Sequence, residues 1–188
     1  MSTKGEIMPT LARVIEHYTY DDYKEWEGNW ELIDGIPLAM SPAPMRIHQS
    51  LATEIMYNLR EQLDECTQCE VLGEIDYKVS DDTILKPDIV LTCGETNESY
   101  LTKAPEIVVE IISKSTAKRD EKYKFEIYEK EKVNYYILVY PNDLRAKVYK
   151  LEGSKYDKQG DFLQESYNFK ETTCKVSLDF ERVFKRFR

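Results

Sequence analysis

Apolar residues recur along this chain with two different periods, and these periods predict its longest helix and one of its strands. Residues 47–63 place an apolar side chain at every fourth position from Ile47 to Leu63, which is typical of one face of an amphipathic helix. Residues 71–79 alternate apolar and polar side chains, which predicts a half-buried strand.

Capping and turn residues bound the other predicted elements. The spacing of Thr19 and Asp22 is typical of a capping box and predicts a short helix over residues 20–27. Asp34-Gly35, between two apolar runs, predicts a β-hairpin over residues 30–40. Further strands are predicted over residues 85–91, 105–112, 135–140, 146–151, 162–167 and 173–176, and further helices over residues 117–131 and 180–188.

These elements mix strands and helices without strict alternation, which predicts an α/β fold with a mixed sheet. The hairpin would lie near the N-terminus, and additional antiparallel strands would lie near the C-terminus. The chain has no internal repeat and no long Gly-, Ser- or Pro-rich linker, so residues 1–188 are expected to form a single domain.

The composition and the N-terminal sequence suggest a location inside the cell. The chain is 41% hydrophobic and 32% charged, which is ordinary for a globular protein, and its N-terminus lacks the pattern of a signal peptide. We therefore expect a cytoplasmic protein that does not enter a membrane. The four cysteines would then be reduced thiols, and Cys66-x-x-Cys69, with neither a second pair nor a nearby histidine, is weak evidence for zinc.

The net charge of −9 argues against a protein that coats nucleic acid, because phosphate binding relies on Lys and Arg. It leaves a nuclease possible, since carboxylates that hold divalent cations are themselves acidic. A basic strip does follow Glu110, although a solvated face of mixed charge explains most of it equally well. Its members are Lys114, Lys118, Arg119, Lys122 and Lys124.

Three acids, Glu31, Asp88 and Glu110, fall within strands that are otherwise largely apolar. Moving a carboxylate from water into such surroundings costs on the order of several kcal/mol or more, unless a cation or hydrogen bonds offset this cost. Magnesium or manganese would be a suitable partner for such oxygens. The alternative, an acid that faces solvent or pairs with Lys or Arg, is the better reading for any one of them alone. It fits Glu110 least, because apolar residues surround it on both faces.

The chain resembles the putative restriction endonuclease family of the PD-(D/E)XK superfamily over roughly residues 18–150. The segments that carry this resemblance, in order, are Glu31-Leu32-Ile33-Asp34-Gly35, Ser41-Pro42-Ala43-Pro44 with His48, Lys86-Pro87-Asp88-Ile89-Val90, residues 105–116, Asp120, Lys124 with Tyr128, and residues 135–141. The implied fold is a restriction-endonuclease-like mixed central sheet flanked by helices.

The resemblance implies that Asp88 and Glu110 are metal ligands. It also implies that the main-chain carbonyl of Ile111 is a further ligand and that Glu31 joins the acidic cluster. His48 matches the family's histidine, and we expect it to support the site without serving as a general base, because a metal-bound water can supply the nucleophile unaided.

One position departs from the superfamily pattern, which places a lysine two residues after the second acid, where this chain has Ile112. Either the lysine has moved or catalysis is lost. Steps of about 100° per residue around the following helix place Lys124 on the inward face with Asp120, and Lys122 on the face toward water. The family's displaced lysine matches Lys124. A surface lysine whose stem covers Tyr128 is the alternative.

These observations predict a metal-dependent endonuclease that hydrolyses phosphodiester bonds, most simply in DNA, with Mg²⁺ or Mn²⁺ as cofactor. Lys124 would orient the water or stabilise the transition state, and Asp120 would position Lys124. Two other readings stay open: an inactive nuclease fold that acts as a binding or scaffold module, and a sugar hydrolase that uses two carboxylates. The resemblance further implies a homodimer.

Overall fold

A six-stranded mixed sheet forms the centre of the computed structural model, which describes residues 16–40 and 45–188. Its strand order is β10-β9-β8-β7-β6-β3, and only the β7–β8 pair among these is parallel. The mixed sheet confirms the predicted α/β class. Its strands are β3 (Cys69–Gly73), β6 (Ile89–Cys93), β7 (Ile107–Ile111), β8 (Tyr135–Tyr140), β9 (Arg145–Glu152) and β10 (Lys155–Phe162).

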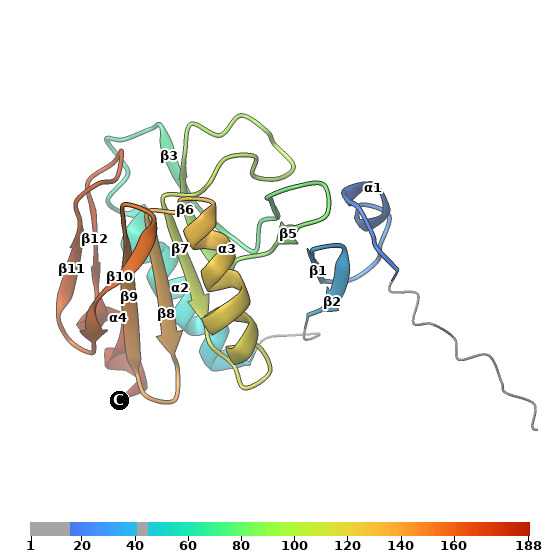
Figure 1. Cartoon of the computed structure of the whole chain (residues 1–188). Helices are drawn as coiled ribbons and strands as arrows, with labels where there is room; N and C mark the ends of the chain where they lie inside the picture. Colours follow the sequence, from blue (N-terminus) through green and yellow to red (C-terminus); the bar gives the residue numbers. More distant parts are fainter. Residues whose placement is uncertain (1–15, 41–44) are drawn as a thin grey trace, which may run out of the picture.

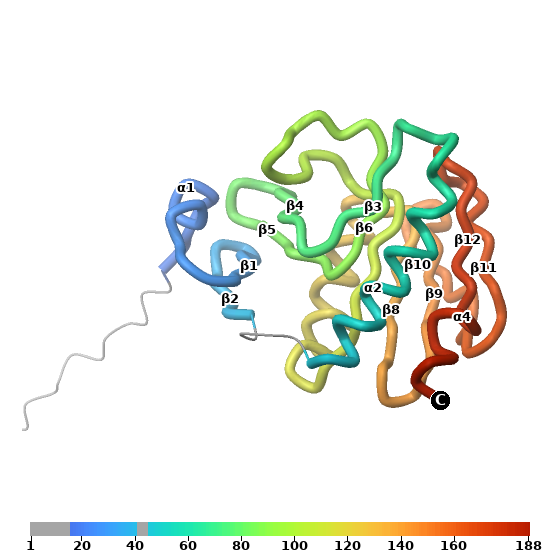
Figure 2. Tube along the Cα trace, turned by 180° about the vertical axis from the view of Figure 1, so that it is seen from behind, coloured from blue at the N-terminus to red at the C-terminus, as the bar shows by residue number. Residues whose placement is uncertain are grey.

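Two helices cover the two faces of this sheet, α2 (Arg46–Arg60) on one side and α3 (Phe125–Lys130) on the other (Figure 1, Figure 2). Each face has its own hydrophobic core, and the strands alternate between them: Val109 packs in the core under α2, whereas Val108 packs in the core under α3. Because β7 is buried on both faces, its sequence is almost continuously apolar. Glu110 shares the face of Val108.

A smaller sheet, ordered β2-β1-β5-β4, carries the predicted hairpin. At its turn, Asp34 and Gly35 have φ values of 49° and 73°, as a two-residue turn of this kind requires. Gly35 also leaves no room for a side chain, since a Cβ there would lie 2.4 Å from His17 Cδ2. The strands are β1 (Trp30–Ile33), β2 (Ile36–Ala39), β4 (Tyr77–Lys78) and β5 (Ile84–Leu85).

The first predicted helix is present but shorter than expected. It begins at the predicted capping box, where the main-chain nitrogen of Thr19 donates to the Asp22 carboxylate at 2.9 Å. The helical span α1 ends at Tyr23 instead of residue 27 (Tyr20–Tyr23). Trp26 lies beyond it in a ring cluster with Tyr18 and Trp30, so aromatic packing replaces the last helical turn.

Two strands that the sequence predicts as continuous are each divided between the two sheets. The strand over residues 71–79 breaks after β3, where Glu74 turns the chain with a φ of 51°. The strand over residues 85–91 breaks between β5 and β6, where Pro87 has no N–H for a ladder hydrogen bond. The second break leaves Asp88 at the point where the chain enters the central sheet.

The C-terminal strands also differ from the prediction: β10 was not predicted, and the strand predicted over residues 173–176 begins only at Val176. The segment over residues 162–167 is not one strand: β10 ends at Phe162, and a separate pair, β11 (Ser166–Phe169) and β12 (Val176–Asp179), follows. The polar composition of β10 hides it in the sequence, because its outer face meets water. The predicted terminal helix is present as α4 (Phe180–Phe184) and a 3₁₀ turn, η2 (Lys185–Phe187).

The four cysteines form two disulfides, Cys66–Cys174 and Cys69–Cys93. The expectation of four reduced thiols is therefore wrong for this structure. The pairing of β3 with β6 places Cys69 opposite Cys93, and the chain before β12 brings Cys174 to Cys66. Both contacts join segments that are distant in the sequence, so the Cys-x-x-Cys spacing could not reveal them.

Within residues 16–40 and 45–188, no helix combines the length and the apolar composition needed to cross a membrane. The Ser41-Pro42-Ala43-Pro44 motif used for the family resemblance lies outside these described residues.

The loop between β6 and β7 is organised by a single carboxylate, Glu95, which accepts hydrogen bonds from the main-chain nitrogens of Thr96, Asn97, Thr102 and Lys103 at 2.7–3.1 Å. Partial burial opposes ionisation, but these bonds outweigh it and lower the pKa of Glu95 from 4.5 to about 2. A lowered pKa means that the carboxylate stabilises the loop above pH 4.5 and that this contribution disappears as the pH falls through about 2.

We therefore expect Glu95→Gln to cost the loop about 1 kcal/mol at pH 7, after allowance for solvent screening. Hydrogen exchange of the four amides should be faster in this variant at pH 7. The difference from wild type should shrink below pH 4.5. Glu98→Gln, at an exposed position of the same loop, is the matched control, and equal exchange in both variants would contradict the assigned role of Glu95.

Candidate active site

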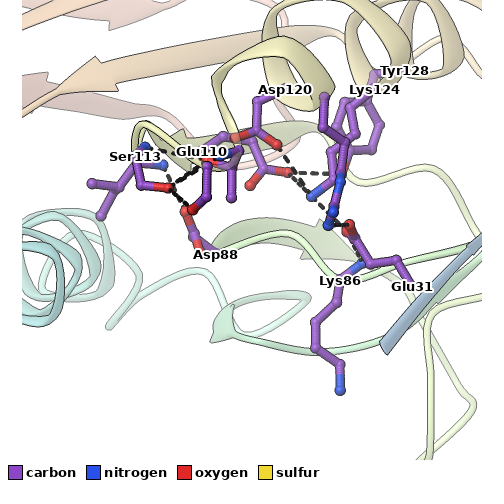
Figure 3. Close-up of polar contacts among 12 residues, drawn as sticks. Glu31, Lys86, Asp88, Glu110, Ser113, Asp120, Lys124 and Tyr128 are labelled. Atoms are coloured by element: carbon purple, nitrogen blue, oxygen red, sulfur yellow. Dashed lines mark hydrogen bonds and ion pairs between the residues drawn. The ribbon is translucent and has the colours of Figure 1, made fainter. Parts of the chain in front are cut away.

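Asp88 directly precedes β6, and Glu110 lies in the neighbouring antiparallel strand β7. The register pairs Ile89 with Val109. Asp88, directly before Ile89, is therefore opposite Glu110, directly after Val109. Directly opposite side chains on one face have Cβ atoms roughly 5 Å apart. The two acids predicted to act together are thus adjacent, with Lys124 and Asp120 beside them (Figure 3).

Asp88 is held by two donors. The main-chain nitrogen of Ile111 donates to its Oδ2 at 2.6 Å, and His48 Nε2 lies 3.1 Å from the same oxygen. The Asp88 side chain remains 14% exposed, so it is the acid of this cluster that solvent reaches. Because both contacts use Oδ2, the carboxylate can offer Oδ1 to a ligand without losing either of them.

Glu110 is buried in the middle of the fold, and only 2% of it is exposed. Its Oε1 accepts hydrogen bonds from Lys124 Nζ at 2.9 Å and from the Tyr128 hydroxyl at 3.1 Å. Burial raises the pKa of Glu110 well above 4.5; the Lys124 charge lowers it, and neighbouring acids raise it further. Glu110 therefore takes up a proton at a higher pH than an exposed glutamate does.

Lys124 occupies the centre of the cluster. Its ammonium lies 2.6 Å from Glu31 Oε1, 2.9 Å from Glu110 Oε1 and 3.7 Å from Asp120 Oδ1. Burial lowers the pKa of Lys124, but the three carboxylates outweigh it and raise that pKa well above 10.5. The lysine thus keeps its charge although it is only 2% exposed. Lys122 is exposed, as the helical periodicity predicts.

The helix segment that carries Lys124 is a π-helix, η1 (Arg119–Lys124), which continues into α3. In a π-helix each N–H bonds five residues back, so every turn holds more residues than in an α-helix. Such segments are often associated with functional sites. Here both Asp120 and Lys124 are turned into the core.

Glu31 is fully engaged by cations and one main-chain donor. Its Oε1 accepts a hydrogen bond from the main-chain nitrogen of Lys86 at 3.0 Å and also contacts the ammonium of Lys124. Its Oε2 accepts a hydrogen bond from Arg119 Nη1 at 2.8 Å. Burial raises the pKa of Glu31, but these partners outweigh it, so the net direction is downward from 4.5. Glu31 is thus ionised and paired.

Arg119 is the member of this cluster that the sequence did not single out, since it was only one residue of a basic strip. It lies within η1, and its partner Glu31 is 88 residues away in the sequence. No periodic signal could therefore place it beside Glu31.

Asp120 precedes Lys124 by four residues in η1 and is 3% exposed. Burial raises the pKa of Asp120, while Lys124 and a hydrogen bond with Thr116 lower it, and the net direction is upward from 3.8. The main-chain oxygen of Asp120 accepts a hydrogen bond from the Tyr136 hydroxyl at 2.9 Å. The strand β8 therefore fixes the segment that carries Lys124.

His48 joins the site from the first turn of α2. It borders a cavity of about 280 Å³ that is also lined by Gln49, Thr53, Glu74 and Asp88. Burial lowers the pKa of His48, but its contact with Asp88 outweighs this and raises that pKa above 6.5. The ring therefore orients Asp88 at the edge of an open cavity.

The described residues offer limited donors for a cation at this site. Groups of three His, Cys, Asp or Glu side chains with ligand atoms within 4.8 Å occur, in this part of the chain, at the cysteines and not here. A cation at the site would therefore depend on Asp88, Glu110 and oxygens of main chain or solvent.

The mixed sheet, with a lysine–carboxylate cluster beside the start of β6 and the end of β7, defines a restriction-endonuclease-like protein. A family model described as "Uma2: Putative restriction endonuclease" matches residues 19–177. Since this match spans most of the chain, the protein belongs to that family, and the membership supports a nuclease function.

A solved structure has the same fold. It is described as a putative nuclease belonging to DUF820 from Anabaena variabilis, and it is similar to this chain with a TM-score of 0.69 and 15% sequence identity. The similarity covers 89% of this chain and 97% of the other. No curated protein matches the sequence.

Proposed function

We propose that this protein is an endonuclease that hydrolyses phosphodiester bonds in DNA and depends on Mg²⁺ or Mn²⁺. The observation that carries the proposal is the buried contact between Lys124 and Glu110, directly beside Asp88, in a chain of this family. Lys124 replaces the lysine that the superfamily pattern places two residues after the second acid, where this chain has Ile112. Family membership also favours a nuclease over a sugar hydrolase.

The donor set fits a hard divalent cation. Asp88 offers a partly exposed carboxylate, Glu110 a buried one, and the main-chain carbonyl of Ile111 a further oxygen of the kind that Mg²⁺ and Mn²⁺ prefer. When bound, such a cation lowers the pKa of a water molecule and balances charge on a phosphate. We assign Glu31 to the positioning of Lys124 and Arg119, because both of its oxygens are engaged.

The remaining residues prepare the site for a phosphate. Lys124 supplies a fixed positive charge that stabilises the additional negative charge of the transition state, and Asp120 and Glu31 hold its ammonium in place. His48 fixes the orientation of Asp88. The adjoining cavity gives a phosphodiester access to this carboxylate.

A catalytically inactive binding module is the second candidate. Ile112 in the motif position and the net charge of −9 favour it. It differs from the nuclease in one measurable way, because it would bind a divalent cation or nucleic acid without breaking a bond.

The test follows supercoiled plasmid, single-stranded DNA and RNA with and without Mg²⁺ or Mn²⁺. Wild type is expected to nick the plasmid only when metal is present, and Asp88→Asn is expected to reduce cleavage to background while its melting temperature stays close to that of wild type. Lys118→Ala, an exposed change in the basic strip, is the matched control.

Thermal stability is measured in parallel as the metal is titrated. Metal binding without cleavage would support the binding module, and an absence of metal binding would sink both the cofactor assignment and the nuclease. Cleavage of RNA alone would overturn the DNA assignment. Sedimentation of the full chain tests the homodimer that we propose from the family resemblance.

A further inference from the structure

A second cluster of chemically reactive side chains lies at the other end of the central sheet. Its members are the four cysteine sulfurs, which we call the cysteine cluster: Cys66, Cys69, Cys93 and Cys174. The sulfurs of Cys66, Cys69 and Cys174 lie within 4.8 Å of one another, and Cys69 is also bonded to Cys93. Three segments of the chain, around Cys66 and Cys69, Cys93 and Cys174, therefore bring four sulfurs to a single place.

We propose that the reduced cysteine cluster is a Zn²⁺ site. Four thiolates in tetrahedral arrangement are the usual ligands of structural zinc, and Cys66-x-x-Cys69 has the spacing by which one turn supplies two of them. With zinc–sulfur bonds of about 2.3 Å, tetrahedral sulfurs are roughly 3.8 Å apart. Once the S–S bonds are broken, the paired sulfurs can separate to this distance by side-chain rotation.

The surroundings of the cysteine cluster suit a metal ion that has buried ligands on one side and solvent access on the other. Cys69 and Cys174 are buried, at 7% and 1% exposure, whereas Cys66 and Cys93 are partly exposed. Glu106 fixes the segment that carries Cys174, since its carboxylate accepts hydrogen bonds from the main-chain nitrogen and the hydroxyl of Thr173. Glu106 is therefore a positioning residue for this cluster.

Conversion of the disulfide form into the zinc form takes two steps. Reduction of the two disulfides by a dithiol takes up four electrons and four protons, so that each S–S bond becomes two thiols while two dithiol molecules become cyclic disulfides. Binding of one Zn²⁺ then releases the four thiol protons to solvent and forms four zinc–sulfur bonds.

The cysteine cluster is separate from the candidate active site. Asp88 precedes the first residue of β6, and Cys93 is the last residue of that strand. A strand of this length spans roughly 16 Å at about 3.3 Å per residue. The proposal therefore does not depend on nuclease activity, and each can fail without the other.

The experiment uses the full chain, reduced with a dithiol and kept free of oxygen, and titrates Zn²⁺ against a chromophoric chelator. Native mass spectrometry should show one zinc per chain, with the mass of four protons lost. Cys69→Ser and Cys174→Ser should each weaken binding by more than about 100-fold, the upper range for the loss of an outer-shell partner. Asp88→Asn should keep full affinity.

Substitution with Co²⁺ gives a second measurement that needs no variant to fold. The reduced wild type should show the intense visible bands of tetrahedral cobalt and the charge-transfer absorption of thiolate ligands. The proposal is overturned if the reduced protein, with four titratable thiols, takes up neither metal. Equal zinc affinity in wild type and Cys69→Ser would overturn it as well.

Discussion

Replacement of Lys124 by methionine is expected to lower the free energy of unfolding by about 3–5 kcal/mol at pH 7, because it leaves buried carboxylates without their cation. Glu31, Glu110 and Asp120 all contact the ammonium, and each is at most 3% exposed. Denaturant unfolding of wild type and variant at equal protein concentration measures this loss.

The loss should depend on pH in a defined direction. The pKa of Glu110 and that of Asp120 are both raised in the folded protein. As the pH falls, these acids take up protons and no longer need the lysine, so the difference between wild type and Lys124→Met should shrink. Glu110→Gln in the Lys124→Met background should recover part of the loss for the same reason.

Lys122→Met is the matched control, because it makes the same chemical change two residues away at an exposed position. It should alter stability by less than about 0.5 kcal/mol, as surface substitutions usually do. A similar loss in both variants would mean that the buried ion pairs are not the cause.

The parts of this site that could be predicted are those that depend on local pattern. Glu110 stands out as an acid in a continuously apolar strand, and Asp88 follows the proline that ends the previous strand. The period of the helix was enough to distinguish Lys124 from Lys122. Each of these inferences needs only neighbouring residues and the requirement that a buried charge has a partner.

The parts that could not be predicted depend on contacts between distant segments. Arg119 reaches Glu31, 88 residues away, from a π-helical segment whose geometry departs from a regular helix. The cysteines meet only because β3 pairs with β6 and because the chain folds back before β12. The two divided strands were also missed. The chain passes from one sheet to the other at Glu74 and at Pro87, but the pattern of apolar and polar side chains continues almost unchanged across both positions.

Glu31→Gln is expected to separate two roles for this acid, metal ligand and holder of Lys124. Glutamine keeps the size of the side chain but presents an amide group to Arg119 and Lys124 in place of a charge. Both cations are then left in a buried site with a weaker partner, which should cost about 3 kcal/mol of stability at pH 7. Chemical unfolding provides the measurement.

The pH dependence of the Glu31 contribution has the sign expected for an acid whose pKa is lowered by folding. Because the folded pKa of Glu31 lies below 4.5, its charge stabilises the protein above pH 4.5, and this contribution is lost as the pH falls through the lowered pKa. The stability difference between wild type and Glu31→Gln should therefore be complete at pH 7 and decrease below pH 4.5.

Metal affinity then decides between the two roles. If Glu31 only positions Lys124 and Arg119, Glu31→Gln should bind Mn²⁺ within about threefold of wild type, which is less than the roughly 10–100-fold cost of disturbing an outer-shell partner of a ligand. Cleavage should nevertheless fall, since Lys124 is no longer held against Glu110. Asp88→Asn, the matched ligand variant, should lose Mn²⁺ binding itself. A parallel loss of Mn²⁺ affinity in Glu31→Gln would instead identify Glu31 as a metal ligand. Its oxygens would then have to leave Lys124 and Arg119 when the cation binds.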